Sequence, residues 1–298
     1  MLKYSIVIVT YNRIELLKEC LKHALNQTLP AEHIIVVDNC STDGTKEYLQ
    51  EYLKTSEKIC VVTEKSNIGG AGGFHDGLKY AYDNTDSEWY MLIDDDAMLD
   101  HTCMEEIDKH YNSKYLACAC KVLRAGEIEM DRRNFSSSSP LPKEEYEKAT
   151  CECENATFCG LMVNRKLVKE IGFPKPEYFI WFDDVEYCMR FIPYTKIEVV
   201  SSAVLDHRTK PRPTAHGQDV FSWKDYYGFR NMVDAYLCHK WYKEFIKLFF
   251  NNLARAAYRG IKSVKYKEDL GSKIILDGTF DGIRHKLGIN PKYFPGKK

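Results

Sequence analysis

The sequence predicts an α/β protein with a doubly wound, mostly parallel sheet and a helical C-terminal region. Short β-branched apolar runs recur along the first hundred residues, and segments with helical spacing separate them. From Phe221 onward the pattern is mostly helical. The 298 residues, 44% of them hydrophobic and 29% charged, suffice for one large or two modest folded domains. Alternating strands and helices imply parallel pairing, with ligands bound at the carboxyl ends of the strands.

Each early element has its own signal. The apolar runs predict four strands, at Ser5–Thr10, His33–Asp38, Ile59–Thr63 and Trp89–Ile93. Helical spacing predicts helices at Ile14–Leu25 and Gly72–Tyr82, and Ser41 or Thr42 is a suitable cap for another helix between them.

Residues 124–150 are polar and rich in Pro and Ser, which predicts a mobile loop or a surface insertion. Strand-like and helical pieces then resume between residues 158 and 206. We expect a first domain over residues 1–215 and a helical, basic region over residues 216–298.

Charge is unevenly distributed. The chain carries a net charge of -1, which argues against a dedicated nucleic-acid binder. Lys240–Lys298, however, holds 14 basic and 5 acidic residues. Lys240–Lys262 can be drawn as an amphipathic helix, which either lies on an anionic membrane surface or packs on the rest of the chain or on a second copy. Its apolar arc would hold Trp241, Tyr242, Phe245, Ile246, Leu248, Phe249, Leu253 and Ala256.

The N-terminus shows neither a signal-peptide core nor a cleavage site, and no apolar run is long enough to span a bilayer. We therefore expect a cytoplasmic protein, with its eleven cysteines as reduced thiols. Two C-x-C pairs, Cys118/Cys120 and Cys151/Cys153, lack the spacing usual for structural zinc, so we expect small side chains in strands and loops.

Three segments carry chemistry-bearing residues. Asp94-Asp95-Asp96 follows an apolar strand, and alternate carboxylates there can share a divalent cation. Asn67–Phe74 holds four glycines in five residues, which favours close backbone approach to a phosphate or ribose. Tyr178–Tyr187 places aromatic residues before Asp183, Asp184 and Glu186, a pattern that suits a sugar ring beside a general base.

Together these segments resemble the inverting family 2 glycosyltransferases of the GT-A fold. The resemblance covers roughly Ser5 to Thr209. Within the family, the chain is most similar to the galactofuranosyltransferases, with rhamnosyltransferases close by. The motifs that carry it are Ile6–Arg13, Asp38-Asn39 with Ser41–Thr45, Asn67–Phe74, the triple Asp, Trp181–Glu186 and Asp206-His207.

The resemblance implies a role for each matching residue. Asp184 would be the general base, Asp183 and Glu186 would position acceptor hydroxyls, and Trp181 would stack on a sugar. Mn²⁺ or Mg²⁺ would bind Asp94, Asp96 and His207. Asp38 would contact the uracil edge, and Asp95 the donor sugar or ribose. The complete nucleotide-sugar set is Thr10, Asn12, Arg13, Asp38, Asn67, Gly69, Gly70, Gly72, Gly73, Asp94 and Asp95.

The expected activity is transfer of galactofuranose from UDP-galactofuranose to a glycan or lipid-linked glycan, on the inner face of the cell membrane. A rhamnosyltransferase that uses dTDP-rhamnose and a non-catalytic glycan-binding protein are the alternatives. A nucleotidyltransferase is disfavoured, because no glycine-rich loop with a basic residue follows the first strand. The Gln-x-x-Arg-Trp motif of processive synthases is absent, so we expect one or a few sugar additions.

Overall fold

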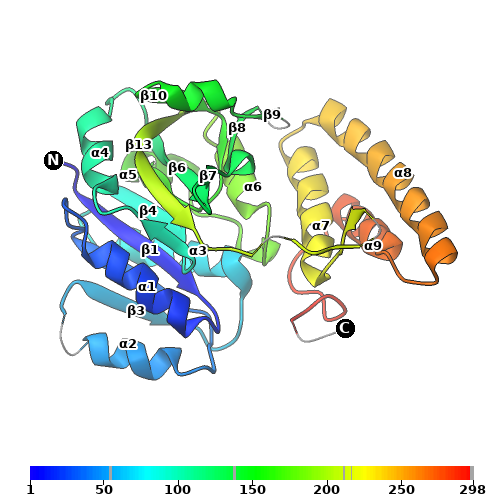
Figure 1. Ribbon diagram of the computed structural model, residues 1–298, viewed down its shortest axis with the longest axis horizontal. Helices are drawn as coiled ribbons and strands as arrows, with labels where there is room; N and C mark the ends of the chain where they lie inside the picture. The colour runs from blue at the N-terminus through cyan, green and yellow to red at the C-terminus, as the bar shows by residue number, and fades with distance from the viewer. Residues whose placement is uncertain (54–55, 137–138, 211, 216, 296–298) are drawn as a thin grey trace.

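A computed structural model describes residues 1–53, 56–136, 139–210, 212–215 and 217–295. Its centre is a ten-stranded sheet of order β10-β13-β6-β12-β4-β1-β2-β3, with β5 paired to β13 and β7 to β6 (Figure 1). The pairs among β1 to β4 are parallel, as is β6 with β13, whereas β10 and β12 run antiparallel to their neighbours. The predicted mostly parallel sheet is thus confirmed. The strands are β1 Tyr4–Thr10, β2 His33–Asp38, β3 Ile59–Thr63, β4 Trp89–Asp94, β5 Ala97–Leu99, β6 Ala117–Arg124, β7 Glu127–Ile128, β10 Thr150–Cys153, β12 Leu161–Asn164 and β13 Ile197–His207.

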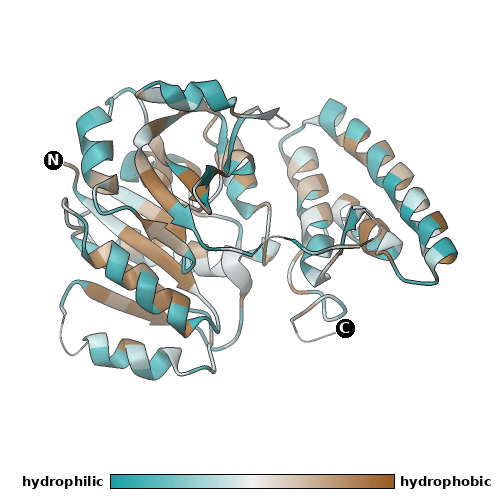
Figure 2. Cartoon of the chain, in the orientation of Figure 1, coloured by the Kyte–Doolittle hydropathy of each residue, from teal (hydrophilic) through white to brown (hydrophobic). Residues whose placement is uncertain are grey.

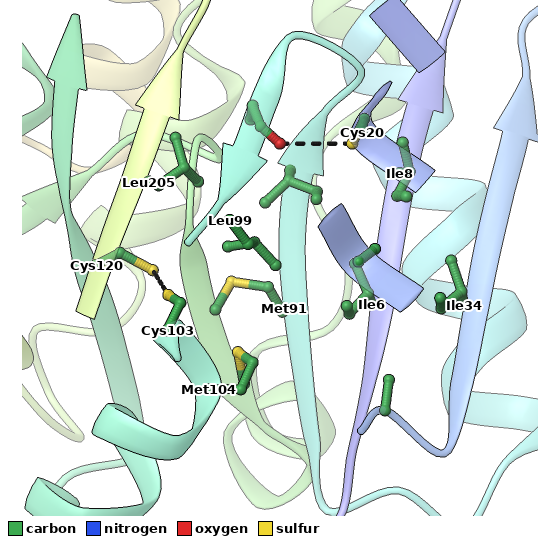
Figure 3. Packing of buried hydrophobic residues seen from close by; sticks show 14 of the residues in the cluster. Ile6, Ile8, Cys20, Ile34, Met91, Leu99, Cys103, Met104, Cys120 and Leu205 are labelled. Carbon is green, nitrogen blue, oxygen red and sulfur yellow. Dashed lines mark hydrogen bonds between the residues drawn. The ribbon is translucent and has the colours of Figure 1, made fainter. Parts of the chain in front are cut away.

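Helices cover both faces of the sheet, because side chains of a strand point alternately to opposite sides. Ile6 and Ile8 of β1 enter a core cluster with Met91 of β4 and Met104 of α4 (Figure 3). Val7 of the same strand enters the cluster on the other face. The first face is covered by α1 Ile14–Leu25, α2 Thr45–Leu53 and α4 Cys103–His110, and the second by α3 Gly69–Asn84, α5 Arg165–Ile171 and α6 Asp183–Met189.

The C-terminal region consists of α7 Trp223–Cys238, α8 Tyr242–Tyr266 and α9 Ser272–Ile283, grouped at one edge of the molecule (Figure 1). Ser222 and Asp225 form a capping box that starts α7. Hydrophobic colouring concentrates on the strands of the sheet, while α8 alternates between hydrophobic and hydrophilic turns (Figure 2). Among the described residues, no helix has both the length and the hydropathy needed to cross a bilayer.

The segment 124–150 differs from the expected mobile loop, although its residues 137–138 lie outside the described part. The fully buried side chain of Arg133 donates hydrogen bonds to the carbonyls of Cys120, Cys159 and Gly160, at 2.9, 2.9 and 3.2 Å. This arginine fastens the segment to the middle of β6 and to the residues just before β12. The segment and its continuation contain β7, β8 Arg133–Ser136, β9 Ser139–Pro140, β10 and β11 Asn155–Ala156, with short 3-10 helices at Met130–Arg132 and Lys143–Glu147.

The two C-x-C pairs lie on separate strands, as small buried side chains. Cys118 and Cys120 belong to β6, and Cys151 and Cys153 to β10, with β13 between the two strands. All four are unbridged. The four sulfur atoms therefore do not form a common metal site.

Helix α3 lies close against the sheet because of its glycines. A Cβ atom on Gly77 would lie 2.5 Å from a Val7 methyl carbon and 2.7 Å from a Val37 methyl carbon, both in the core. A Cβ atom on Gly70 would meet nothing within 4 Å. Gly77 thus sets how closely α3 approaches β1 and β2.

We predict that Gly77→Ala lowers the free energy of unfolding by about 1–2 kcal/mol, because overpacking the core outweighs the gain in helix propensity. Gly70→Ala is the matched control and should be neutral or stabilising by up to about 1 kcal/mol. Urea denaturation of both variants measures the difference. Equal stabilities would contradict the packing role of Gly77.

Candidate active site

The carboxyl ends of β2, β1 and β4 bring predicted residues together. The register places Thr10 opposite Asp38, and Val9 opposite Asp94. Asp38 is buried and accepts a hydrogen bond from the Ser41 amide at 3.0 Å. These neighbouring strand ends form one edge of the candidate site.

The triple Asp lies where β4 turns into β5. Because β5 pairs with the end of β13, His207 stands opposite Ala97, one residue after Asp96. His207 Nε2 consequently lies 3.4 Å from Asp96 Oδ1. The fold thus joins residues that are more than a hundred positions apart in the sequence.

Arg13 neutralises two of the three aspartates. From the loop after β1 it approaches Asp95 Oδ1 at 2.7 Å and Asp96 Oδ2 at 2.6 Å. The Asp95 carboxylate is fully buried and also accepts a hydrogen bond from Thr10 Oγ1 at 2.7 Å. Asp95 was expected to contact a sugar or ribose. In the structure its carboxylate is engaged by Thr10 and Arg13 instead.

The three carboxyl groups differ in acidity. Burial raises the pKa of Asp95 to about 7, against the opposing charge of Arg13. Burial and the charge of Asp96 raise the pKa of Asp94 to about 6. Burial would also raise the pKa of Asp96, but the nearby His207 ring and the charge of Arg13 outweigh it and hold that pKa at about 2. Asp96 is thus the most readily ionised member.

Asp94, Asp96 and His207 suit a divalent cation by their chemistry. Asp96 Oδ1 is buried without a hydrogen-bond partner, and the two carboxylates are ligands of the kind that Mn²⁺ and Mg²⁺ prefer. His207 is the obstacle, since Glu129 and Asp96 flank its ring and raise its pKa to about 9 despite burial. It would have to release a proton before it could bind a metal.

The donor atoms of Asp94, Asp96 and His207 are not grouped closely enough to surround an ion without some rearrangement. Within the described part of the chain, three potential metal-binding side chains whose donor atoms lie within 4.8 Å of one another occur at Asp234, Cys238 and His285. There Asp234 already accepts hydrogen bonds from Tyr178 and lies 2.7 Å from His285 Nδ1. That group therefore fastens α7 to its neighbours.

The glycine-rich segment begins α3 at Gly69, earlier than the expected Gly72. Asn39, at the end of β2, holds this start: its side chain accepts from the Ile68 amide at 2.8 Å and donates to the Gly69 carbonyl at 2.9 Å. Asn67 Oδ1 accepts from the Gly69 amide at 2.8 Å.

Two of the predicted ligand glycines have a packing function. A Cβ atom on Gly72 would lie 2.8 Å from the Ile68 side chain, and one on Gly73 would lie 2.6 Å from Val9. Gly70 remains open to the outside, and exposed Asn12 joins two loops by accepting from the Thr42 amide at 2.7 Å. We therefore interpret Gly73 as required for α3 to approach β1, and Gly72 as required for the Ile68 side chain to pack at the start of the helix.

The loop before α6 has an unusual backbone. Phe179, Trp181 and Phe182 adopt φ values of 65°, 63° and 68°, a left-handed region that is costly for large side chains. The buried Asn231 of α7 holds them there. Its Nδ2 donates to the carbonyls of Tyr178, Ile180 and Trp181, at 3.0, 3.1 and 2.7 Å.

This loop presents Asp183 and Asp184 in the first turn of α6. Burial, then the charge of Asp184, raise the pKa of Asp183 well above its ordinary value, and the charge of Asp94 adds to this effect. Burial also raises the pKa of Asp184, although the Val185 amide and the charge of Arg132 oppose it. Adjacent carboxyl groups with raised pKa values are suited to take up a proton near neutral pH.

Glu186 was expected to position acceptor hydroxyls, but in the structure its carboxylate contacts side chains of the protein. It is buried and accepts from Arg190 at 2.5 Å, while His239 Nε2 lies at 3.0 Å and Lys175 Nζ at 3.6 Å. Burial alone would raise its pKa, but these partners lower it to about 2. Glu186 therefore holds α6 to the C-terminal helices.

Trp181 keeps an accessible face. Its side chain is 39% exposed, with the Arg212 guanidinium 5.4 Å from the ring centre. On its other side it packs near Gly228 of α7, where an added Cβ atom would lie 3.2 Å from the ring. The position is compatible with a sugar stacked beside the two acids.

Sequence reasoning missed three contributors to the site. Arg132, from the segment expected to be a loop, places its charge near Asp94 and Asp184. Lys224, in the first turn of α7, lies near Arg13 and the triple Asp, and burial and Arg13 lower its pKa. Asn231 is the third. The capping box at Ser222–Asp225 could predict where α7 starts, but no sequence signal indicates which way Lys224 and Asn231 face.

A mostly parallel βα sheet with acidic side chains at the carboxyl end of β4 and at the start of α6 has its candidate ligand site at the strand ends, as is usual for α/β proteins. Residues 5–172 match the family described as glycosyl transferase family 2, and the chain belongs to this family.

The chain is also similar to two curated proteins and to a solved structure. It is 37% identical over 114 residues to a poly(ribitol-phosphate) beta-glucosyltransferase of Bacillus spizizenii, covering 37% of this chain and 17% of that protein. It is 20% identical over 237 residues to the low-salt glycan biosynthesis hexosyltransferase Agl10 of Haloferax volcanii, covering 76% and 73%. The crystal structure of GalNAc-T7 with UDP, GalNAc and Mn²⁺ superposes with a TM-score of 0.60 at 16% identity, over 79% of this chain and 48% of that one.

The chain thus spans about a sixth of the first of these relatives and about half of the structural neighbour. At 16% identity the neighbour establishes the fold alone, which is of the GT-A type.

We predict that Asn231→Leu lowers the free energy of unfolding by about 2–5 kcal/mol. The substitution leaves the carbonyls of Ile180 and Trp181 without their donor, and each unsatisfied buried group costs about 1–3 kcal/mol. Urea denaturation tests this, with Asn251→Leu on the exposed face of α8 as the matched control. A stable Asn231→Leu protein would show that the loop does not depend on this amide.

Glu186 predicts a pH dependence of stability. Its pKa is lowered from 4.5 to about 2 in the folded chain, so its contribution is complete above pH 4.5 and is lost as the pH falls through 2. We expect Glu186→Gln to lose on the order of 3 kcal/mol at pH 7 and to show a flatter stability profile between pH 4.5 and 2. Denaturation at a series of pH values checks this, with the exposed Glu147→Gln as control. Parallel profiles for Glu186→Gln and the wild type would contradict it.

Proposed function

We propose that the protein is an inverting glycosyltransferase that moves a sugar from a UDP-sugar to a glycan acceptor in cell-surface polysaccharide synthesis. The observation that carries the proposal is the adjacent pair Asp183 and Asp184, both with raised pKa values, of which Asp183 also responds to the charge of Asp94 at the end of β4. Family membership and the printed functions of the relatives, a beta-glucosyltransferase and a glycan hexosyltransferase, support it.

The reaction needs one base and one stabilised leaving group. Asp184 takes the proton from the acceptor hydroxyl as its oxygen forms a bond to the anomeric carbon. The bond between that carbon and the diphosphate oxygen breaks in the same displacement, and its electron pair leaves with UDP. A single displacement inverts the anomeric configuration. Trp181 stacks on a sugar ring, and buried Asp183 positions the acceptor.

Cationic side chains surround the place where negative charge develops. Arg13 and Lys224 lie near the triple Asp, and the charge of Arg132 also acts on Asp94. They attract the diphosphate and stabilise its growing charge. Asp94, Asp96 and His207 would hold Mn²⁺ or Mg²⁺, which when bound supplies further positive charge to the departing diphosphate. The structural neighbour with UDP and Mn²⁺ supports this cofactor.

The donor nucleoside binds at the ends of β1 and β2. Asp38 lies at the uracil edge, with Thr10, Asn12, Asn67 and the start of α3 around the ribose and diphosphate. For the sugar we propose galactofuranose, on the resemblance of the Trp181–Glu186 and Asn67–Phe74 segments; rhamnose from dTDP-rhamnose is the alternative. A lipid-linked acceptor at the inner face of the cell membrane fits the basic C-terminal region.

The test is release of nucleoside diphosphate with Mn²⁺, Mg²⁺ or a chelator, over UDP-galactofuranose, UDP-galactopyranose and dTDP-rhamnose with lipid-linked acceptors. We predict acceptor-dependent UDP release from the galactofuranose donor, abolished by the chelator. Asp184→Asn should lower the turnover rate by about 10²–10⁴-fold, as expected for loss of a general base.

Asp86→Asn is the matched control for Asp184→Asn, because Asp86 is exposed at the opposite ends of the strands. Release from dTDP-rhamnose alone would replace the donor and keep the mechanism. An active Asp184→Asn enzyme would remove Asp184 as the base. No turnover with any donor would favour a glycan-binding protein.

A further inference from the structure

Helix α8 has two different faces. Its inner face is docked on the rest of the C-terminal region: Asn252 Nδ2 donates to Thr279 Oγ1 at 3.0 Å, and Arg259 Nη2 to the Asp219 carbonyl at 2.7 Å. Phe245 and Leu248 pack against the cluster around Tyr236. Of the eight residues in the arc predicted from the sequence, six are thus at least partly buried, and only Tyr242 and Ile246 are exposed.

The outer face of α8 is apolar and uncovered. Six large side chains recur there at intervals of three, four or eight residues, which places them along one side of the helix. Such a continuous exposed stripe marks an interaction surface, unlike singly scattered apolar residues. This outer stripe consists of Tyr242, Ile246, Phe250, Tyr258, Ile261 and Val264, which are 55%, 53%, 64%, 53%, 72% and 81% exposed.

Positive charge borders the outer stripe. Of the seven charged residues in Tyr242–Tyr266, six are basic and only Glu244 is acidic. Arg259 is used internally, whereas Lys243, Lys247 and Lys265 are exposed beside the apolar side chains. Their ammonium groups have no acidic partner among the described residues. A surface that offers apolar contacts together with anionic groups complements this face.

We propose that the outer stripe of α8 docks the protein on an anionic lipid bilayer, with α8 parallel to the membrane plane. Tyr242, Ile246, Phe250, Ile261 and Val264 enter the boundary between headgroups and acyl chains, and the lysines contact lipid phosphates. A second copy of the chain fits this face less well, because face-to-face packing would bring the two rows of lysines together.

The geometry also explains how docking leaves the site open. α8 is the outermost helix of the C-terminal group, and α7 lies between it and the α/β part (Figure 1). Helix α6, whose first turn carries Asp183 and Asp184, lies on the side of α7 that faces the α/β part (Figure 1). The bilayer contact therefore uses none of the residues assigned to transfer. The inference deepens the proposal of a lipid-linked acceptor, but binding to lipid does not require that transfer occurs.

The experiment is co-sedimentation of the full chain with vesicles of phosphatidylcholine alone or mixed with phosphatidylglycerol. We expect at least ten-fold stronger binding to the anionic vesicles, falling at least ten-fold in the triple variant Ile246→Ser, Phe250→Ser, Ile261→Ser. Replacing Lys243, Lys247 and Lys265 by Gln should remove the preference for anionic lipid. A control triple, Ile192→Ser, Tyr194→Ser, Ile289→Ser, changes large apolar residues outside α8 that are about half exposed, and it should bind like the wild type.

Thermal melting of each variant confirms that it is folded. Vesicle binding that is absent in the wild type, or unchanged in the α8 triple variant, would overturn the inference. So would a wild-type dimer in sedimentation velocity that the α8 variant converts to a monomer without any vesicle binding. UDP release with a water-soluble acceptor, measured in parallel, separates failure of docking from failure of the proposed transfer.

Discussion

The site depends on keeping many carboxyl groups together in a half-buried space. Asp94, Asp95, Asp96, Asp183 and Asp184 would repel one another strongly if all were ionised without partners. Cationic side chains from separate parts of the chain reduce this repulsion. They are Arg13 after β1, Arg132 before β8, His207 at the end of β13 and Lys224 at the start of α7. Asp96 stays readily ionised, while the pKa values of Asp183 and Asp184 rise. This unequal charge distribution is what the proposed cation site and the proposed base both require.

The C-terminal helices contribute to the site through hydrogen bonds. The carbonyls before α6 would be buried and unsatisfied without Asn231, and Arg230 reinforces this by donating to the Glu177 and Tyr178 carbonyls at 3.1 and 3.0 Å. Glu186 adds an ionic connection to His239. The strained backbone at Phe179–Phe182 persists because α7 holds it, so the direction of Asp183 and Asp184 is set partly from outside the α/β part.

The elements and the acidic edge could be predicted from the sequence because they rest on local signals. β-branched runs gave β2 and β3 at their observed bounds, and Asp94 at a strand end placed a candidate site there. The ion pairs of Glu186 could not be predicted, because its partners Lys175, Arg190 and His239 come together only in the folded chain. The polar sequence of residues 124–150 suggests a loop. It does not reveal that Arg133 is buried, because a carbonyl that accepts one of its hydrogen bonds belongs to Cys159, outside the segment. Spacing predicted that α8 is amphipathic, but which of its apolar residues are covered depends on α9.

Helices α9 and α7 connect α8 to the strained loop before α6. The inner face of α8 packs with α9, α9 packs along α7, and α7 carries the Asn231 that fixes the loop before Asp183. A Cβ atom on Gly278 of α9 would meet the Tyr226 carbonyl at 2.6 Å, so α7 and α9 are in backbone contact and cannot slide freely. An outer face seated on a bilayer would thus have a fixed orientation relative to the two acids. An acceptor anchored in that bilayer would reach Asp184 from a constant direction, which favours selection of one hydroxyl over its neighbours on the same sugar.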